Sequence, residues 1–518
     1  LLVTSLRDFP SRHRSMRAVI DRSWQMLTED ERAAFKRLSV FRGGFFQQAA
    51  VAIAGADFTL LASLVDKSFL HHAPSGRYEV HELLRQFGEE KLSTDENAQA
   101  RNRHCHYFAG FLQQRTEDLR HGRMKEMLNE LAEEIENVRA AWNWATQHRQ
   151  VEEIAASYQS LYRFYELRSR FQEGEIALEQ GAQALTAAAN GTRECALRAG
   201  ILWRQARFCQ RLALFDKAKI LLDASLDLSQ RNRLRREAGY ALKELGILGL
   251  LRGEYAQSQE NFQRGLAVFR EAGDELDVCA ALVNLGYAAC QMGQYEAAAR
   301  SLEEGLAIAQ KLRAPEAIGF ALCYLGLVSR GLGNTAEAKQ RFQQALTSYR
   351  EIGHAWGMAL CSHCLANLAT EAGEYDEATR LAEEGLANAK KIGDPNSTSL
   401  CLNRLGEIAC ARKEYDAANR YHLQAVETAW KAKQTPPVLE GLIGLAALCA
   451  KTARADVAYE LLTLVVHHPA TVARERDRAE HLLAELESQL APEAIAAAHE
   501  RGGIAKLEEA VEKLVALA

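Results

Sequence analysis

The chain contains very little proline and no long apolar run. Only 8 of its 518 residues are proline. Alanine, leucine, glutamate and arginine are abundant, which favours helix along almost the whole length. No apolar stretch approaches the roughly 20 residues that are needed to span a bilayer. Because the chain is longer than one hydrophobic core can hold, we expect several domains or an array of repeats.

The usual signatures of catalysis are also missing. No Gly-x-x-x-x-Gly-Lys-Ser/Thr sequence occurs, so the chain has no P-loop to bind nucleotide phosphates. The segment after His81 lacks the second histidine of a zinc protease, and His104 and His106 are spaced unfavourably for one helix face. No Ser/His/Asp set and no carboxylate pair stands out. We therefore predict a chain that is not an enzyme and that binds neither a metal nor a cofactor of its own.

Charge and cysteine content narrow the class further. The net charge of -5 comes from 63 basic and 68 acidic residues, a balance that argues against a dedicated nucleic-acid surface. Cys361 and Cys364 form a CxxC around His363, but no partner pair lies at metal-site spacing. We interpret the 11 cysteines as small packing residues whose free thiols are typical of the cytoplasm. Because the chain begins at Leu1 rather than Met, we expect it to be part of a longer protein.

What the chain does have is a small residue that returns every 40 positions. Alanine or glycine occupies Ala206, Gly246, Gly286, Gly326, Ala366, Gly406 and Ala446. A second small residue follows twelve positions later at Ala218, Ser258, Ala298, Ala338, Ala378, Ala418 and Ala458. A fixed period near 40 is typical of stacked helical repeats. Such arrays offer long binding surfaces, so we expect binding rather than catalysis.

One repeat shows the expected local structure. Residues 274–292 carry apolar positions at helical spacing, Gly293 interrupts the helix, and a second helix begins at Tyr295 and ends near Leu312. The small residues Gly286 and Ala298 are expected to let the two helices cross closely. These features resemble the tetratricopeptide repeat, although that unit is usually about 34 residues long. The resemblance covers residues 195–470, and a more degenerate pair is expected at 151–190.

The first 92 residues have a different pattern. Ile20, Trp24 and Leu27 share one helical face, and Thr28 begins a capping box for the next helix. Two further short helices, a hairpin over residues 69–80 and a helix that begins at His81 follow. The three helices directly before the hairpin, followed by that hairpin, predict a winged helix. The expected fold is therefore all-α: an α-solenoid of tetratricopeptide-like helix pairs, preceded by a small winged-helix domain with one β-hairpin.

Several runs resemble one known family. They are SMRAVIDRSWQMLTEDERAAFKRLSVFRGGF, LLASLVDKSFL, RYEVHELLRQFGEEKL, LAEEIENVRAAWNWA and APEAIAAAHERGGIAKLEEAVEKLVA. They resemble the bacterial signal-transduction NTPases with numerous domains, the STAND proteins. The resemblance implies the end of a preceding helical domain or linker at 1–15, a winged-helix domain at 16–95, a helical connector at 96–150, a tetratricopeptide-like sensor domain at 151–470 and C-terminal capping helices at 471–518.

The same resemblance implies a role for one histidine. Val80-His81-Glu82 aligns with the family's Met-His-Asp motif, which implies that His81 contacts the β-phosphate of ADP in a nucleotide-binding domain absent from this chain. ADP or ATP with Mg would then be cofactors of the intact parent, an expected ATPase that oligomerises on activation. The alternative is an ordinary histidine at a helix terminus without a ligand.

The predicted ligand site is the groove lined by the first helix of each pair. Counting from the small residues gives these candidate groove residues: Trp203, Arg207, Tyr240, Lys243, Tyr287, Phe320, Arg330, His363, Asn367, Asn403 and Glu407. Aromatic and cationic side chains come first, and amides and a carboxylate follow. Such a surface suits a protein, a peptide or a polar small molecule as the activator. The alternative for each position is a solvated helix residue.

Two other functions remain open from the sequence. The array could be a scaffold that bridges partners without any nucleotide switch, or the winged helix could bind DNA as a transcriptional regulator. Against DNA binding, the candidate recognition helix at residues 60–68 has Lys67 as its single base. Basic residues nevertheless cluster at Arg12, Arg14, Arg17, Arg22, Arg32, Lys36, Arg37 and Arg42. We expect no membrane partner and little nucleic-acid binding through this chain.

Overall fold

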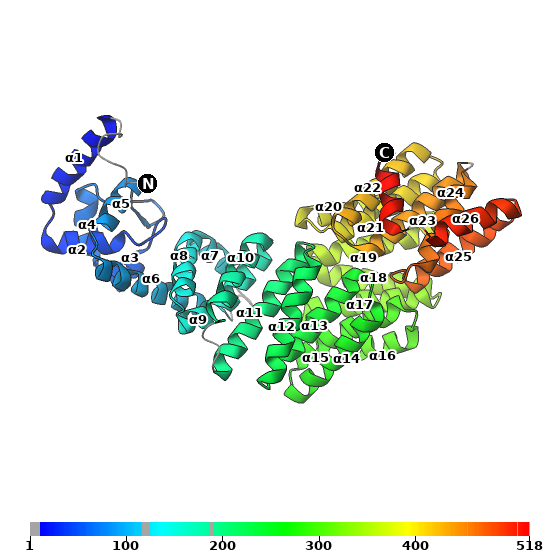
Figure 1. Cartoon of the computed structure of the whole chain (residues 1–518), viewed down its shortest axis with the longest axis horizontal. Helices are drawn as coiled ribbons and strands as arrows, with labels where there is room; N and C mark the ends of the chain where they lie inside the picture. The colour runs from blue at the N-terminus through cyan, green and yellow to red at the C-terminus, as the bar shows by residue number, and fades with distance from the viewer. Residues whose placement is uncertain (1–10, 117–123, 187–190, 453, 505, 517–518) are drawn as a thin grey trace. The chain divides into compact units, whose positions relative to one another are not determined.

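Two compact units divide the chain, Leu1–Gln205 and Ala206–Ala518. The computed structural model describes residues 11–116, 124–186, 191–452, 454–504 and 506–516. The first ten residues of the predicted segment 1–15, and residues 117–123 of the predicted connector, lie outside this description. Within the described part the fold is a succession of helices with one two-stranded sheet (Figure 1).

The first unit opens with short helices and the hairpin. Its first elements are α1 (Ser11–Gln25), α2 (Glu29–Leu38), α3 (Gln47–Ala54), α4 (Phe58–Asp66), β1 (His71–His72), β2 (Tyr78–Glu79) and α5 (Glu82–Glu90). The two strands are antiparallel, with His71 opposite Glu79, and Phe45 forms an isolated bridge to Tyr78. The helices and hairpin thus follow one another in the order that the sequence predicts.

Capping and aromatic packing explain this local structure. Thr28 accepts a hydrogen bond from the Glu31 N–H, and the Glu31 side chain accepts one from the Thr28 N–H, so the predicted capping box is confirmed. Trp24 packs edge-on against Phe35 and Phe87 with ring centres 6.2 and 5.5 Å apart. Offset and edge-on pairs of this kind favour a well-defined aromatic core.

Five further helices follow in this unit, and a sixth crosses into the second. They are α6 (Thr94–Gln114), α7 (Met124–Glu133), α8 (Ile135–Gln147), α9 (Val151–Leu167), α10 (Phe171–Ala184) and α11 (Thr192–Arg211). The predicted connector segment Leu131–Ala145 is helical but interrupted at Glu134. The carboxylate of Glu134 accepts hydrogen bonds from the side chains of Arg77 and Asn137, which hold this break in place.

The second unit consists mainly of helix pairs that repeat every 40 residues. The helices are α12 (Phe215–Arg231), α13 (Arg235–Arg252), α14 (Tyr255–Ala272), α15 (Glu275–Gln291), α16 (Tyr295–Lys311), α17 (Pro315–Gly331), α18 (Thr335–Ile352), α19 (Ala355–Glu371), α20 (Tyr375–Ile392), α21 (Pro395–Ala411), α22 (Tyr415–Lys431), α23 (Thr435–Lys451) and α24 (Ala455–His467). The expected all-α solenoid is confirmed.

The repeated small residues have the packing role that the sequence predicts. A β-carbon added at Gly286 would lie 2.5 Å from Leu302 Cγ and 3.1 Å from the Ala298 carbonyl oxygen. At Gly326 it would lie 2.6 Å from Phe342 Cε1. Since such contacts are far below van der Waals distance, glycine is what lets each pair of helices approach so closely.

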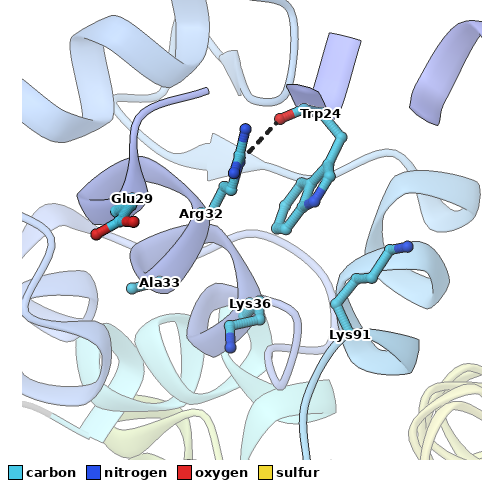
Figure 2. Close-up of a pocket in the computed structure, with 6 residues that line it drawn as sticks. All are labelled: Trp24, Glu29, Arg32, Ala33, Lys36 and Lys91. Carbon is cyan, nitrogen blue, oxygen red and sulfur yellow. Dashed lines mark hydrogen bonds between the residues drawn. The ribbon is translucent and has the colours of Figure 1, made fainter. Parts of the chain in front are cut away.

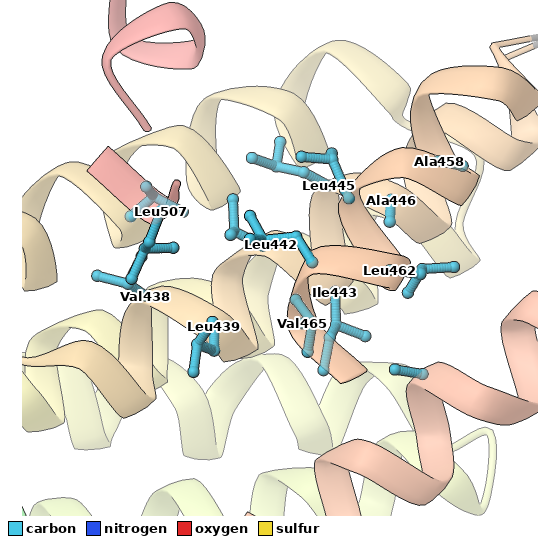
Figure 3. Packing of buried hydrophobic residues seen from close by; sticks show 14 of the residues in the cluster. Val438, Leu439, Leu442, Ile443, Leu445, Ala446, Ala458, Leu462, Val465 and Leu507 are labelled. Carbon is cyan, nitrogen blue, oxygen red and sulfur yellow. The ribbon is translucent and has the colours of Figure 1, made fainter. Parts of the chain in front are cut away.

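Three helices complete the second unit: α25 (Ala473–Glu487), α26 (Pro492–Ile504) and α27 (Leu507–Ala516). An apolar cluster that includes Leu442, Ile443 and Leu462 joins α23 and α24, and Leu507 of α27 packs into it (Figure 3). The C-terminal helices therefore cover the last repeat, where an array would otherwise expose its apolar face.

No single described helix is both long and apolar enough to cross a membrane, although α3 and α4 together form a bent pair, at 103°, that matches by length and composition alone.

Candidate functional site

The first helix of each pair lines one side of the repeat array, which we call the inner face. Successive first helices, such as α15 and α17, α19 and α21, and α21 and α23, contact one another directly. The array also contacts itself across several repeats, because α13 touches α23. The inner face is thus the concave side of a tightly wound superhelix.

At the N-terminal end of the inner face, the predicted residues form local polar pairs. The Arg207 guanidinium lies 3.2 Å from the carboxylate of Glu244, whose side chain is almost wholly buried. The Tyr240 hydroxyl donates a hydrogen bond of 2.6 Å to Asp277. Burial and this hydrogen bond raise the pKa of Tyr240 to about 12. Lys243 Nζ lies 5.0 Å from the centre of the Tyr240 ring, a distance typical of a cation–π contact.

Trp203 is not part of this group. It lies in the first unit, on α11, where its side chain is buried. Its ring packs edge-on against Tyr162 at 6.1 Å, and the Arg204 guanidinium sits 4.0 Å from its centre. We therefore read Trp203 as a packing residue of the first unit.

Aromatic side chains dominate the middle of the inner face. Tyr287 stacks on Tyr324 with ring centres 4.4 Å apart, and burial raises the pKa of the Tyr287 hydroxyl. Phe320 packs against Trp356 at 5.4 Å and edge-on against Tyr349 at 5.7 Å. The predicted aromatic residues are therefore half-buried parts of a continuous packed surface.

The C-terminal part of the inner face carries a dense group of charges. We call it the arginine–glutamate cluster, and its members are Arg330, Glu371, Arg404, Glu407, Glu440, Arg474, Glu475 and Arg478. The predicted residues Arg330 and Glu407 belong to it. Arg330 pairs with Glu371 at 2.7 Å, and its side chain is only 7% exposed.

Three of the cluster's side chains come from α25. Arg474 lies 3.1 Å from Glu371 on α19, and Arg478 lies 2.7 Å from Glu407 on α21. Glu475 lies between the two arginines, 3.4 and 3.6 Å away. The C-terminal segment thus reaches back over residues more than one repeat earlier and covers part of the inner face.

Burial sets the charge states within and beside the cluster. Desolvation lowers the pKa of Arg404 to about 9, although Glu440, 3.6 Å away, favours its charged form. Desolvation also raises the pKa of Glu440, with a further contribution from the charge of Glu475. Burial likewise lowers the pKa of the His363 imidazole, helped by the nearby arginines, so this ring is neutral. The cluster is therefore tightly coupled and poorly solvated.

The remaining predicted residues are buried next to the cluster. His363, Asn367 and Asn403 are 8%, 2% and 1% exposed. Asn403 Oδ1 lies 2.6 Å from Nδ1 of His422, which comes from the second helix of the pair. Burial lowers the pKa of His422 to about 3, so the ring is neutral and its Nδ1–H donates to the amide oxygen.

The sequence interpretation missed six of the eight residues of the arginine–glutamate cluster. Glu371, Arg404 and Glu440 were not among the predicted groove residues. The three α25 residues were missed because residues 471–518 were expected only to cap the array. A usable signal was present: Arg474 and Arg478 are four positions apart on one helix face. The sequence could not show which side of the array this helix covers.

His81 belongs to the first unit. It is exposed and occupies the N-cap of α5, where its Nδ1 accepts a hydrogen bond of 3.3 Å from the Leu83 N–H. A capping side chain at the start of a helix stands beside free N–H groups, which favour an anion. This position agrees with the predicted helix start and leaves the nucleotide role untested.

A pocket of about 270 Å³ lies near α1, α2 and α5 in the same unit (Figure 2). Trp24, Arg32, Lys36 and Lys91 are among its lining residues. Arg32 donates to the Trp24 carbonyl oxygen at 3.1 Å, and Lys36 pairs with Glu96 at 2.6 Å. Because these cations already have protein partners, the pocket is not an obvious anion site.

The candidate DNA-recognition helix is also engaged within the protein. Leu61 and Leu64 of α4 are buried. Lys67, the single base of the segment, lies 2.7 Å from the buried carboxylate of Glu31. Burial raises the pKa of Glu31, but hydrogen bonds from Lys67 and Ser63 outweigh it and lower the pKa to about 2. This helix therefore packs on protein as expected.

The cysteines are small packing residues, as the sequence predicts. All 11 are free and buried, and Cys361 and Cys364 lie in an apolar cluster with Cys323. Burial raises the pKa of the Cys290 thiol to about 12, which disfavours the reactive thiolate. Among the described residues, no group of three or more His, Cys, Asp or Glu side chains is placed to hold a metal ion.

Comparison with known proteins agrees with the repeat architecture. Residues 277–351 and 358–429 match the family model of the tetratricopeptide repeat, so the second unit contains such repeats. Proteins of Mycobacterium bovis and Mycobacterium tuberculosis that are described as HTH-type transcriptional regulators are 30% identical over 184 residues, which is 34% of this chain. The chain spans about a fifth, 21%, of the length of these curated relatives.

One solved structure is similar over nearly the whole chain. It is the Signal Transduction ATPase with Numerous Domains (STAND) protein with a tetratricopeptide repeat sensor, PH0952, from Pyrococcus horikoshii. The similarity covers 99% of this chain and 68% of that one, with a TM-score of 0.50 and 16% sequence identity. At this identity the likeness concerns the fold.

Proposed function

We propose that this chain is the sensing and regulatory part of a STAND-type signal-transduction protein, whose inner face binds an activating protein, peptide or small molecule. The observation that carries the proposal is the inner face itself. Its first helices carry aromatic and charged side chains along one surface, from Tyr240 to Glu407. Helical repeat arrays use such surfaces for binding. The similar fold of a protein with a tetratricopeptide repeat sensor supports this reading.

The regulatory role would require the first unit. We propose that residues 16–95 act as a winged-helix domain, 96–150 as a connector, 151–470 as the sensor and 471–518 as its C-terminal cap. His81 would hold the β-phosphate of ADP in a nucleotide-binding domain of the intact protein. That parent would be a cytoplasmic ATPase using ATP and Mg, and ligand binding would favour its open, oligomeric state. A ligand can shift this equilibrium only by its differential affinity for the two states.

Native mass spectrometry of the purified chain tests the sensor role. The chain is measured before and after incubation with cell extract and re-isolation. A defined added mass that is retained in a control variant and lost on Tyr240→Ala with Lys243→Ala would support binding at the inner face. An unliganded monomer in every extract would favour the scaffold alternative.

The nucleotide switch needs a separate test in the intact protein. His81→Ala should raise basal signalling, because it removes a contact to the ADP that holds the off state. His72→Ala, which alters an exposed histidine of the neighbouring hairpin, is the matched control. Unchanged basal signalling in His81→Ala would remove the proposed switch and leave the sensor role intact.

A transcriptional output is a second candidate function. It is favoured by the similarity to proteins described as HTH-type transcriptional regulators. Because Lys67 and the apolar face of α4 are engaged within the protein, we propose that DNA binding would be carried by another part of the intact protein. The chain itself should then leave a DNA duplex unshifted at 50 mM salt, where electrostatic binding is strongest.

A further inference from the structure

We propose that the acidic side chains of the inner face form a docking surface for an arginine-bearing helix of a protein partner, and that α25 occupies this surface until the partner binds. The surface consists of Glu371 on α19, Glu407 on α21 and Glu440 on α23. The inference rests on the proposed sensor function and names the chemistry of its input.

Charge and spacing support this assignment. Arg474 and Arg478 are one helical turn apart on α25, and each reaches a glutamate from a different repeat. Successive first helices of the array lie side by side, so arginines at positions i and i+4 can bridge two neighbouring repeats. The inner face thus binds a pair of arginines on one face of a helix, and α25 shows how such a helix lies against it.

The attachment of α25 to the inner face is weak enough for a partner helix to replace it. The apolar contacts of α25 lie toward its C-terminal end, where Ala479 and Leu486 are buried and Leu482 and Leu483 are half-buried against the apolar cluster of the last repeat. The side chains of Arg474 and Arg478 are 38% and 29% exposed, and a partner helix that brings the same two arginines would keep Glu371 and Glu407 paired, so the exchange leaves no buried carboxylate uncompensated. Because its N-terminal end is held mainly by ion pairs, α25 can open locally at that end.

The flanking segments keep α25 close when it moves aside. Ala470, just before α25, packs so tightly on Gly253 that an added β-carbon there would lie 2.3 Å from the alanine Cβ. After α25, Gly502 of α26 packs against α24, where an added β-carbon would lie 2.5 Å from the Glu460 carbonyl oxygen. The helix is therefore a tethered occupant that can swing out and return.

Buried polar atoms near α25 show that it satisfies the surface incompletely. Nε of Arg330, Nε of Arg404 and Nδ2 of Asn403 are buried N–H donors without a hydrogen-bond partner within the protein. Unsatisfied buried donors are costly. A partner helix that adds a carboxylate or amide acceptor to its two arginines would satisfy them and compete with α25. The expected partner segment therefore combines an Arg-x-x-x-Arg pair with acidic or amide side chains.

A peptide with the sequence of residues 473–487 is the probe. We expect a fluorescent form of it to bind the chain carrying Arg474→Gln and Arg478→Gln at least about tenfold more tightly than the unaltered chain, because the weakened α25 no longer competes. The matched control carries Arg341→Gln and Arg380→Gln, which alter arginines paired with glutamates on their own second helices. Equal affinity for all three chains overturns the proposal.

Charge reversal tests specificity. In the chain with Arg474→Gln and Arg478→Gln, adding Glu407→Arg should weaken peptide binding about tenfold. A peptide with glutamate in place of Arg478 alone should recover binding to that chain, because Arg478 is the arginine that pairs with Glu407 while Arg474 pairs with the unaltered Glu371. Loss without recovery would mean that Glu407 has only a structural role, and the proposal would be wrong.

Hydrogen exchange on the unaltered chain avoids any folding defect of the variants. Saturating peptide should speed exchange of the α25 amides severalfold and leave α26 unchanged; unaltered α25 exchange contradicts the proposal.

The sensor function and the docking surface can be contradicted by different results. If the chain gains a ligand in native mass spectrometry but does not bind the peptide, the sensor role is supported and the proposed docking surface is wrong. Selective peptide binding without any ligand from extract would sustain the inference and weaken the sensor role.

Discussion

The repeats of the second unit can be compared at one equivalent buried position of their second helices. The residue at this position distinguishes the repeats with a purely apolar core from the repeat beside the arginine–glutamate cluster. Each small residue of the first helix faces a side chain sixteen positions later in the second helix. These facing residues are Leu222, Phe262, Leu302, Phe342, Ala382, His422 and Leu462, and all are buried. Six are apolar, while His422 is polar and lies beside the arginine–glutamate cluster.

This contrast shows that the 40-residue repeat constrains the size of the facing side chain more than its polarity. A β-carbon at Gly326 would clash with the Phe342 ring, and one at Gly406 would lie 2.7 Å from His422 Cε1. Both rings therefore fill the same kind of gap between helices. The His422 repeat keeps the packing and adds a hydrogen bond to Asn403, so the array can carry polar groups without breaking its register.

The largest expected effect is at an apolar facing position. Phe342→Ala should destabilise its repeat by about 3–5 kcal/mol, because it leaves a cavity between α17 and α18. Because the cavity is confined to one repeat, hydrogen exchange of the α17 and α18 amides is the suitable measurement. Protection equal to that of the unaltered chain would contradict the assigned packing role.

A smaller effect is expected at the polar facing position. His422→Leu should cost about 1–3 kcal/mol, because the buried Asn403 oxygen loses its hydrogen-bond donor. Adding Asn403→Leu should recover much of this loss, since both polar groups are then gone. The two variants are compared by denaturant unfolding, and a double variant no better than the single one would mean that size, not hydrogen bonding, matters here.

Lowering the pH should destabilise the repeat that contains His422 more than the repeats whose facing residue is apolar. The folded pKa of His422 is about 3, below the unfolded value of about 6.5. The unfolded chain then binds more protons as pH falls, so the stability from neutral His422 is complete above pH 6.5 and is lost below it. Between pH 7 and 5.5 this amounts to about 1 kcal/mol. The chain with His422→Leu and Asn403→Leu should show a correspondingly shallower pH dependence of its denaturation midpoint.

The smallest effect is expected on the second helices. Arg380 pairs with Glu377 one turn away on α20, and its side chain is 60% exposed. Arg380→Gln should change stability by less than about 0.5 kcal/mol. A thermal melt distinguishes this from a larger loss, which would show that surface pairs of the array form a cooperative network.

The sequence predicts the helix pairs well because their determinants are local. The small residue, the Gly293 break and the aromatic start at Tyr295 all act within one repeat, and α15 and α16 begin and end within two residues of the predicted positions. The capping box at Thr28 is local in the same way. Helix periodicity and turn chemistry are enough for these features.

The candidate site depends on distant contacts, so only part of it could be predicted. Glu371 and Arg474 are separated by 103 positions in the sequence, and no local pattern connects them. Counting along the first helices found Arg330 and Glu407. It also selected Trp203, which packs in the first unit, and it could not tell that Asn403 is buried against a histidine from the neighbouring helix.

The contact of α13 with α23 has a mechanical consequence. In an open array each repeat touches only its neighbours, so a pulling force or thermal fraying removes repeats from an end one at a time. Here the first and last turns of the superhelix share a surface, and Gly253 rests on Ala470. Detaching one end must break contacts at the other, so the unit should resist gradual unwinding and then open in a single large step.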